Sequence, residues 1–104
     1  VVSILHRASG IGLFLALPLI LLVLRTSVNS AQSYQSLINL LNTWPLKLLL
    51  IGLAWAFSHH FFAGIRHLLQ DIHWMTSLNN ARLSSRILLC LVGLSTLIFA
   101  WFIW

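Results

Sequence analysis

The stretch from His60 to Asp71 reads HFFAGIRHLLQD and closes a long apolar run that begins at Leu46. An apolar run of this length predicts a membrane-spanning helix. Each helical residue turns by about 100°, so His60, Gly64, His67 and Asp71 share one face. Ionisable groups at membrane depth are costly and usually face a partner, a cofactor or water. The sequence therefore predicts that the chemistry lies on this face.

The composition of the chain is typical of a membrane protein. Of its 104 residues, 60% are hydrophobic and 7% are charged, which is far from the composition of a soluble globular domain. The net charge is +5, but the basic residues punctuate apolar runs and form no patch, which argues against nucleic acid as a partner. The single cysteine, Cys90, excludes a disulfide framework and a thiolate metal site.

Three apolar segments predict an all-α, integral membrane bundle of three transmembrane helices. At this length the chain is one domain, a transmembrane anchor covering residues 1–104. The spans are expected at about 3–25, 45–71 and 84–104, which is long enough to cross the hydrocarbon core of a bilayer. Residues 26–44 change sharply in composition and predict an interfacial loop that includes a short, weakly amphipathic helix. Pro45 suits the first turn of the second span.

The second connection, residues 72–82, is short and polar, with a turn expected at Asn79-Asn80 and Trp74 expected at head-group level. Basic residues are unevenly divided between the two ends of the spans. The end that carries the N-terminus holds Arg7, Arg66, Arg82 and Arg86, against Arg25 and Lys47 at the other end. Because cytoplasmic ends are enriched in Lys and Arg, the N-terminus is expected on the cytoplasmic or matrix side.

The start of the chain leaves one alternative open. Arg7 followed by an apolar stretch is also the pattern of a secretory signal peptide, which residues 1–31 would then form. Against this interpretation, His6 and Arg7 already lie in the helical pattern, and the later spans match the first in kind. Because this pattern starts immediately at Val1, we expect a further segment to precede it.

The first motif is Ser3-Ile4-Leu5-His6-Arg7-Ala8-Ser9-Gly10. Ser3, Arg7 and Gly10 share one helical face, and His6 adjoins it. One interpretation is structural, with a serine near a helix start and an arginine that reaches the head groups. The other is a pair of hydrogen-bond donors for a lipid-soluble ligand that carries oxygens. A quinone needs donors directed at its carbonyl oxygens, and Ser and Arg supply them.

The second motif is the histidine face of the central span. Neutral imidazole is a common axial ligand of haem iron, and Gly64 would let a flat macrocycle approach the backbone. His67 lies about 10 Å from His60 along the helix axis, near the level of His6. Donors at that level suit the propionates of a haem held at His60. His59 lies a quarter turn away and is interpreted as packing or a contact with a partner helix.

Two rival interpretations remain at this point. His6 and His67, at equal depth, could bind a metal between the first and second spans. Alternatively, the chain is a small membrane structural or assembly protein with no cofactor. No other histidine is expected at the depth of His60, so a six-coordinate haem would need its second ligand from another subunit.

With both motifs identified, the chain resembles the cytochrome b membrane-anchor subunit of succinate dehydrogenase, respiratory complex II. The resemblance covers essentially the whole chain and depends on Ser3-x-x-His6-Arg7-x-Ser9-Gly10 and His60-x-x-x-Gly64-Ile65-Arg66-His67-x-x-x-Asp71. The family usually has an Arg-Pro motif before the first span, and this sequence begins too late to show it. Gln70 also stands where an aromatic residue or Met commonly precedes the aspartate, which could alter the rim of the quinone pocket.

The resemblance implies that His60 is an axial ligand of a haem b shared with a small anchor subunit, which supplies the other histidine. It also implies that Ser3 and Arg7 line the ubiquinone site. The residues expected near the haem propionates are His6, Arg66 and His67.

The implied function is that of the anchor subunit of a succinate:quinone oxidoreductase in a bacterial or mitochondrial inner membrane. Succinate oxidation would belong to a separate flavoprotein, and an iron–sulfur subunit would deliver electrons to the quinone. A quinol:fumarate reductase is the alternative, because the same residues suit either direction of catalysis.

Overall fold

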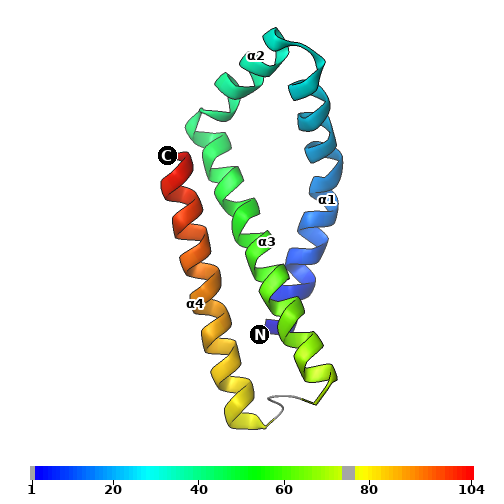
Figure 1. Cartoon of the computed structure of the whole chain (residues 1–104), viewed down its shortest axis with the longest axis vertical. Helices are drawn as coiled ribbons and strands as arrows, with labels where there is room; N and C mark the ends of the chain where they lie inside the picture. Colours follow the sequence, from blue (N-terminus) through cyan, green and yellow to red (C-terminus); the bar gives the residue numbers. More distant parts are fainter. Residues whose placement is uncertain (1, 74–76) are drawn as a thin grey trace.

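The computed structural model describes residues 2–73 and 77–104 and gives four helices in them (Figure 1). These are α1 (Val2–Asn29), α2 (Ala31–Leu41), α3 (Trp44–Asp71) and α4 (Leu78–Ile103). Helices α1, α3 and α4 are long and apolar enough to cross a membrane, which confirms the prediction of an all-α bundle with three spans. Trp74, expected at head-group level, lies outside the described residues.

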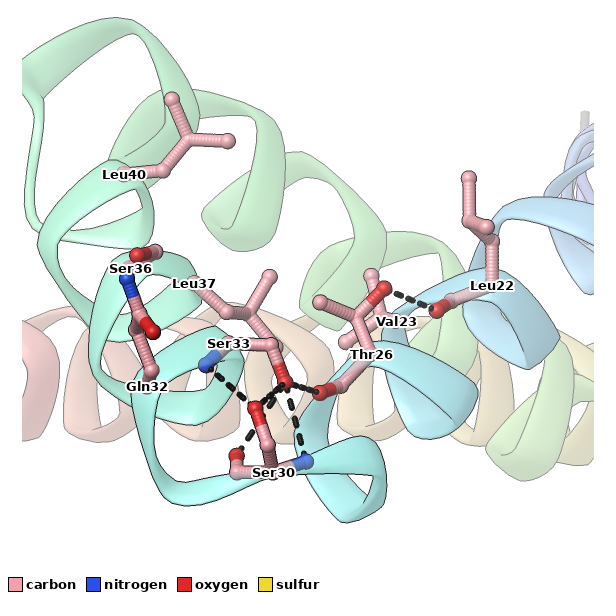
Figure 2. A pocket seen from close by; sticks show the side chains of 9 residues that line it. All are labelled: Leu22, Val23, Thr26, Ser30, Gln32, Ser33, Ser36, Leu37 and Leu40. Carbon is pink, nitrogen blue, oxygen red and sulfur yellow. Dashed lines mark hydrogen bonds between the residues drawn. The ribbon is translucent and has the colours of Figure 1, made fainter.

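Helix α1 continues past Arg25 and ends at Asn29. A turn held by Ser30 and Ser33 then leads the chain into α2 (Figure 2). Ser30 caps α2, because its hydroxyl accepts from the backbone N–H of Ser33 at 3.0 Å. The Ser33 hydroxyl in turn donates to the carbonyl of Thr26 at 2.8 Å. These bonds satisfy backbone groups that two helix ends would otherwise leave unpaired. Between the last turns of α1 and the helix α2 lies an open cavity of about 590 Å³.

The short helix predicted within residues 26–44 is α2, and no residue of it is buried. Helix α3 then begins at Trp44 with Pro45 in its first turn, as predicted. The ammonium of Lys47 lies 5.1 Å from the ring centroid of Trp104, a distance at which a cation is attracted to an indole face. This contact joins the beginning of α3 to the end of α4.

The connection between α3 and α4 differs from the sequence prediction. The turn expected at Asn79-Asn80 is wrong, because α4 already begins at Leu78. Ser77 caps this helix, and its side chain accepts from the backbone N–H of Asn80 at 3.3 Å. A serine N-cap favours a helix start, and the asparagines then occupy the first turn, where polar side chains are well tolerated.

Helix α3 is the central element of the bundle (Figure 1). It packs antiparallel to α4 and crosses α1, which diverges from α3 toward α2. The core is small: Ala63 of α3 packs with Leu88 and Val92 of α4, and Phe62 lies against them. Most large apolar side chains are exposed on the outside of the bundle, as expected where lipid replaces water as the solvent.

The tight contact at Ala63 generates a prediction about stability. Ala63 is 0% exposed, so Ala63→Leu would overpack the seam between α3 and α4 and cost about 1–3 kcal/mol. A Cβ added at Gly52 of the same helix meets no atom within 4 Å, so Gly52→Leu is the matched control. The measurement is unfolding of the purified protein in a titration with denaturing detergent. Equal midpoints for the two variants would contradict this packing.

Candidate functional site

The crossing of α1 and α3 brings three histidines together. The ring of His6 stacks on that of His60, with centroids 4.5 Å apart and planes inclined by 6°. The same ring lies 4.9 Å from that of His67, at 50°. The proximity of His6 and His67 agrees with the sequence analysis. The expectation that no other histidine lies at the depth of His60 is wrong, because the ring of His6 contacts both His60 and His67, which are two turns apart on α3.

Two glycines lie at this crossing, and the one on α1 makes its closeness possible. A Cβ placed on Gly10 of α1 would lie 3.0 Å from Cε1 of His60, too close unless the imidazole moved. A Cβ on Gly64 of α3 would lie 3.7 Å from Nε2 of His6, which is an ordinary contact. Gly10 therefore faces the ring of His60. The sequence predicted that a macrocycle could approach the backbone at Gly64, but in the structure the space beside Gly64 faces His6.

The orientation of His60 distinguishes its two ring nitrogens. Its Nδ1 lies 3.4 Å from the backbone carbonyl of His6. In the tautomer that carries a proton on Nδ1, this nitrogen donates to the carbonyl, and Nε2 keeps its lone pair. A histidine that binds a metal through one nitrogen usually donates the other N–H to an acceptor of this kind. The surroundings of His60 therefore suit a metal ligand.

His60 opens onto a recess of about 450 Å³ on the outside of the crossing, and the recess combines apolar walls with polar groups. It is lined by His6, Arg7, Gly10, Ile11, Phe14 and His60. Ser3 is exposed one turn before Arg7 and does not line the recess. An apolar recess lined by two imidazoles and a guanidinium suits a flat, apolar ligand that carries oxygens or acidic groups.

The structure does not bring Arg66 to the histidines. Its Nε–H donates to the hydroxyl of Ser84 at 3.0 Å, and its Nη2 to the carbonyl of Ala81 at 3.4 Å. Both partners belong to α4, so Arg66 faces the helix on the other side of α3. Asp71, the last residue of α3, is exposed.

His59 is fully buried, in contrast to its neighbour His60. Its ring stacks on Trp55 with centroids 5.2 Å apart. Neither ring nitrogen has a hydrogen-bond partner among residues 2–73 and 77–104. These observations support the interpretation of His59 as a packing residue.

The ligand geometry disfavours the rival metal site between His6 and His67. Within the described part of the chain, no three His, Cys, Asp or Glu side chains are grouped as a metal site would need. Protein metal sites usually offer at least three such ligands.

Fold and site together define a class of protein: an integral membrane helical bundle with a histidine cluster at the crossing of two spans. The chain belongs to the succinate dehydrogenase/fumarate reductase transmembrane subunit family, whose model matches residues 1–99. It is similar to the succinate dehydrogenase cytochrome b556 subunit of Coxiella burnetii. The two are 40% identical over 87 residues, which cover 82% of this chain and 69% of that relative. The resemblance inferred from the two motifs is confirmed.

The bond that holds Arg66 on the α4 face can be tested directly. Ser84→Ala removes the acceptor of the Arg66 Nε–H at a half-buried position, which should cost about 1–3 kcal/mol of stability. Ser85→Ala, at the neighbouring half-buried serine, leaves this bond in place and should change the stability little. The midpoint of unfolding in denaturing detergent gives both values. Equal losses in the two variants would show that Arg66 is oriented in another way.

Proposed function

We propose that the chain is the membrane anchor of a succinate:quinone oxidoreductase, which binds haem b together with a partner subunit and contributes to the ubiquinone site. Family membership and the similarity to a cytochrome b556 subunit support this proposal. The observation that carries it is the position of His60, whose Nδ1 faces the carbonyl of His6 while its ring lines the recess. The name of the relative favours a succinate dehydrogenase over the fumarate reductase alternative.

His60 is the proposed axial ligand of the haem iron. Its Nδ1–H would donate to the His6 carbonyl, which orients the ring and raises the basicity of Nε2. When bound, haem b supplies one-electron redox chemistry. Because the ring of His6 stacks on that of His60, His6 would not hold the iron together with His60, and we assign the second histidine to a small anchor subunit.

His6 and His67 are the residues that we place near the propionates, because the ring of His6 stacks on that of His60 and the ring of His67 adjoins that of His6. Imidazole N–H groups can donate to carboxylates and so offset their charge. Arg66, which the resemblance placed with them, is bonded to α4 in this structure. We therefore assign it no contact with the haem.

Ser3 and Arg7 are proposed to bind the quinone. They stand four residues apart on α1, so both lie on the same face of the helix. The Ser3 hydroxyl would donate to a carbonyl oxygen of the quinone. The Arg7 guanidinium would stabilise the negative charge that develops on the oxygens as electrons arrive, before protons follow. A quinone site at this end of the bundle requires that an iron–sulfur subunit docks nearby. A flavoprotein would oxidise succinate. The N-terminus would lie on the cytoplasmic or matrix side.

The haem assignment is tested by substituting two adjacent histidines separately and comparing the two variants. His60→Ala should abolish or strongly weaken the haem signal in the reduced-minus-oxidised optical spectrum of the purified complex, while the spans stay inserted. His59→Leu is the control, because His59 packs between helices and is not proposed to bind iron. An unchanged spectrum in His60→Ala, or loss of haem in both variants alike, would refute the assignment.

The quinone assignment needs an assay that separates quinone reduction from succinate oxidation. Arg7→Gln and Ser3→Ala should each lower succinate:ubiquinone reductase activity, by about 10- to 100-fold for Arg7, since a lost bond to a charged donor costs about 1.5–3 kcal/mol. Succinate oxidation with a water-soluble electron acceptor should be unchanged. Arg25→Gln, at the opposite end of α1, is the control. Equal losses in both assays would indicate failed assembly and argue against a quinone contact.

A further inference from the structure

A second polar site lies on the other side of α3, away from the histidines. Between the last turns of α3 and the first turns of α4 is a recess of about 340 Å³. It is lined by Arg66, Ala81, Arg82, Ser85 and Arg86. Three of the six basic residues of the chain therefore meet at one recess, at the end of the bundle where α3 ends and α4 begins (Figure 1).

Arg66 is held in position at this recess by α4. Its Nε–H donates to Ser84, one Nη2–H donates to the carbonyl of Ala81, and the Ser84 hydroxyl also donates to Ala81 at 2.9 Å. A guanidinium has five N–H donors, and among residues 2–73 and 77–104 two of them are bonded, which leaves three for another acceptor. Arg66 is thus a half-buried, oriented cation with unused donors.

The positive charge of the recess is not neutralised by its own walls. Arg82 and Arg86 stand four residues apart on α4, a spacing at which like charges repel each other. The only acidic residue in the sequence is Asp71, and it does not line the recess. Three guanidiniums around one cavity favour an anion with several oxygens, and phosphate groups fit the fork-shaped donors of arginine.

The surface beside the arginines favours a lipid as the source of that phosphate. Arg82, Arg86, Leu89 and Gly93 follow one another at spacings of three and four residues, so they form one stripe on α4. Leu89 is 47% exposed, and a Cβ on Gly93 would meet nothing within 4 Å. The stripe thus leads from two cations onto an open apolar surface that runs toward the middle of the span. A phospholipid has an anionic phosphate followed by an apolar acyl chain, which matches the order of this stripe. A soluble phosphate would contact only the arginines.

We propose that this recess binds the head group of an anionic phospholipid, with its phosphate on Arg66, Arg82 and Arg86 and an acyl chain along Leu89 and Gly93. The bound lipid relieves the repulsion among the arginines at the connection between α3 and α4. This site is separate from the haem and quinone assignments and does not depend on them.

The test uses the purified, delipidated complex that contains this chain, titrated with phosphatidylglycerol or phosphatidylcholine and read by native mass spectrometry. Arg82→Gln/Arg86→Gln removes two exposed cations and leaves the bonds of Arg66 to α4 in place. Arg25→Gln/Lys47→Gln removes two charges at the other end of the bundle and is the matched control. We expect the first variant to bind phosphatidylglycerol roughly 30-fold more weakly, from the usual contribution of two basic residues near anionic lipid. The control should match the unmodified complex, and phosphatidylcholine should bind weakly to all three.

Four results would overturn the proposal. Equal affinity for the two lipids, or phosphatidylglycerol binding that survives the loss of Arg82 and Arg86, would remove the phosphate contact. Displacement of phosphatidylglycerol by inorganic phosphate at similar concentration would assign the recess to a soluble anion. Loss of a partner subunit from the Arg82→Gln/Arg86→Gln complex, with lipid retained, would assign it to an acidic surface of that partner.

Discussion

The close approach of α1 to α3 at Gly10 is the contact on which the histidine site depends. In lipid, apolar side chains gain little by leaving their solvent, so helices associate through tight packing and polar contacts. Gly10 supplies the packing, because a Cβ at this position would lie only 3.0 Å from the ring of His60. The backbone carbonyl of His6 supplies the polar contact, to Nδ1 of the same ring. The side chain of His60 therefore makes the contact between α1 and α3 and is also the proposed ligand of the cofactor.

The two faces of α3 show how one helix serves separate purposes. His59 and His60 are neighbours in sequence, but the helical turn of about 100° sends them to different surroundings. His59 is sealed beside Trp55, and neither of its nitrogens is bonded to any described residue. His60 is half-buried and lines a recess. An imidazole without a hydrogen-bond partner in an apolar interior costs free energy, and the stack on Trp55 offsets part of this cost.

The parts of this fold that the sequence predicts are those determined by local information. Hydropathy and length identify the three spans, because each must satisfy its backbone hydrogen bonds within itself when surrounded by lipid. The shared face of His60, Gly64 and His67 follows from helical periodicity alone. The helix start at Leu78 was missed, although Ser77 stands at the N-cap and offers the signal. Asparagine is common in turns, so Asn79 and Asn80 led to the wrong prediction of a turn at these positions.

What the sequence could not supply is the relation between helices. The stacking of His6 on His60 depends on where α1 crosses α3, and no residue pattern in either helix specifies that point. The direction of Arg66 depends in the same way on α4, which offers Ser84 and the carbonyl of Ala81 to its donors. A long cationic side chain on a central helix can reach either neighbour, and the available acceptors decide between them. Two chemically similar sets of basic side chains thus lie on opposite sides of α3. One set lies beside the proposed iron ligand, and the other lies at the start of α4, where we propose a lipid phosphate as its counter-charge.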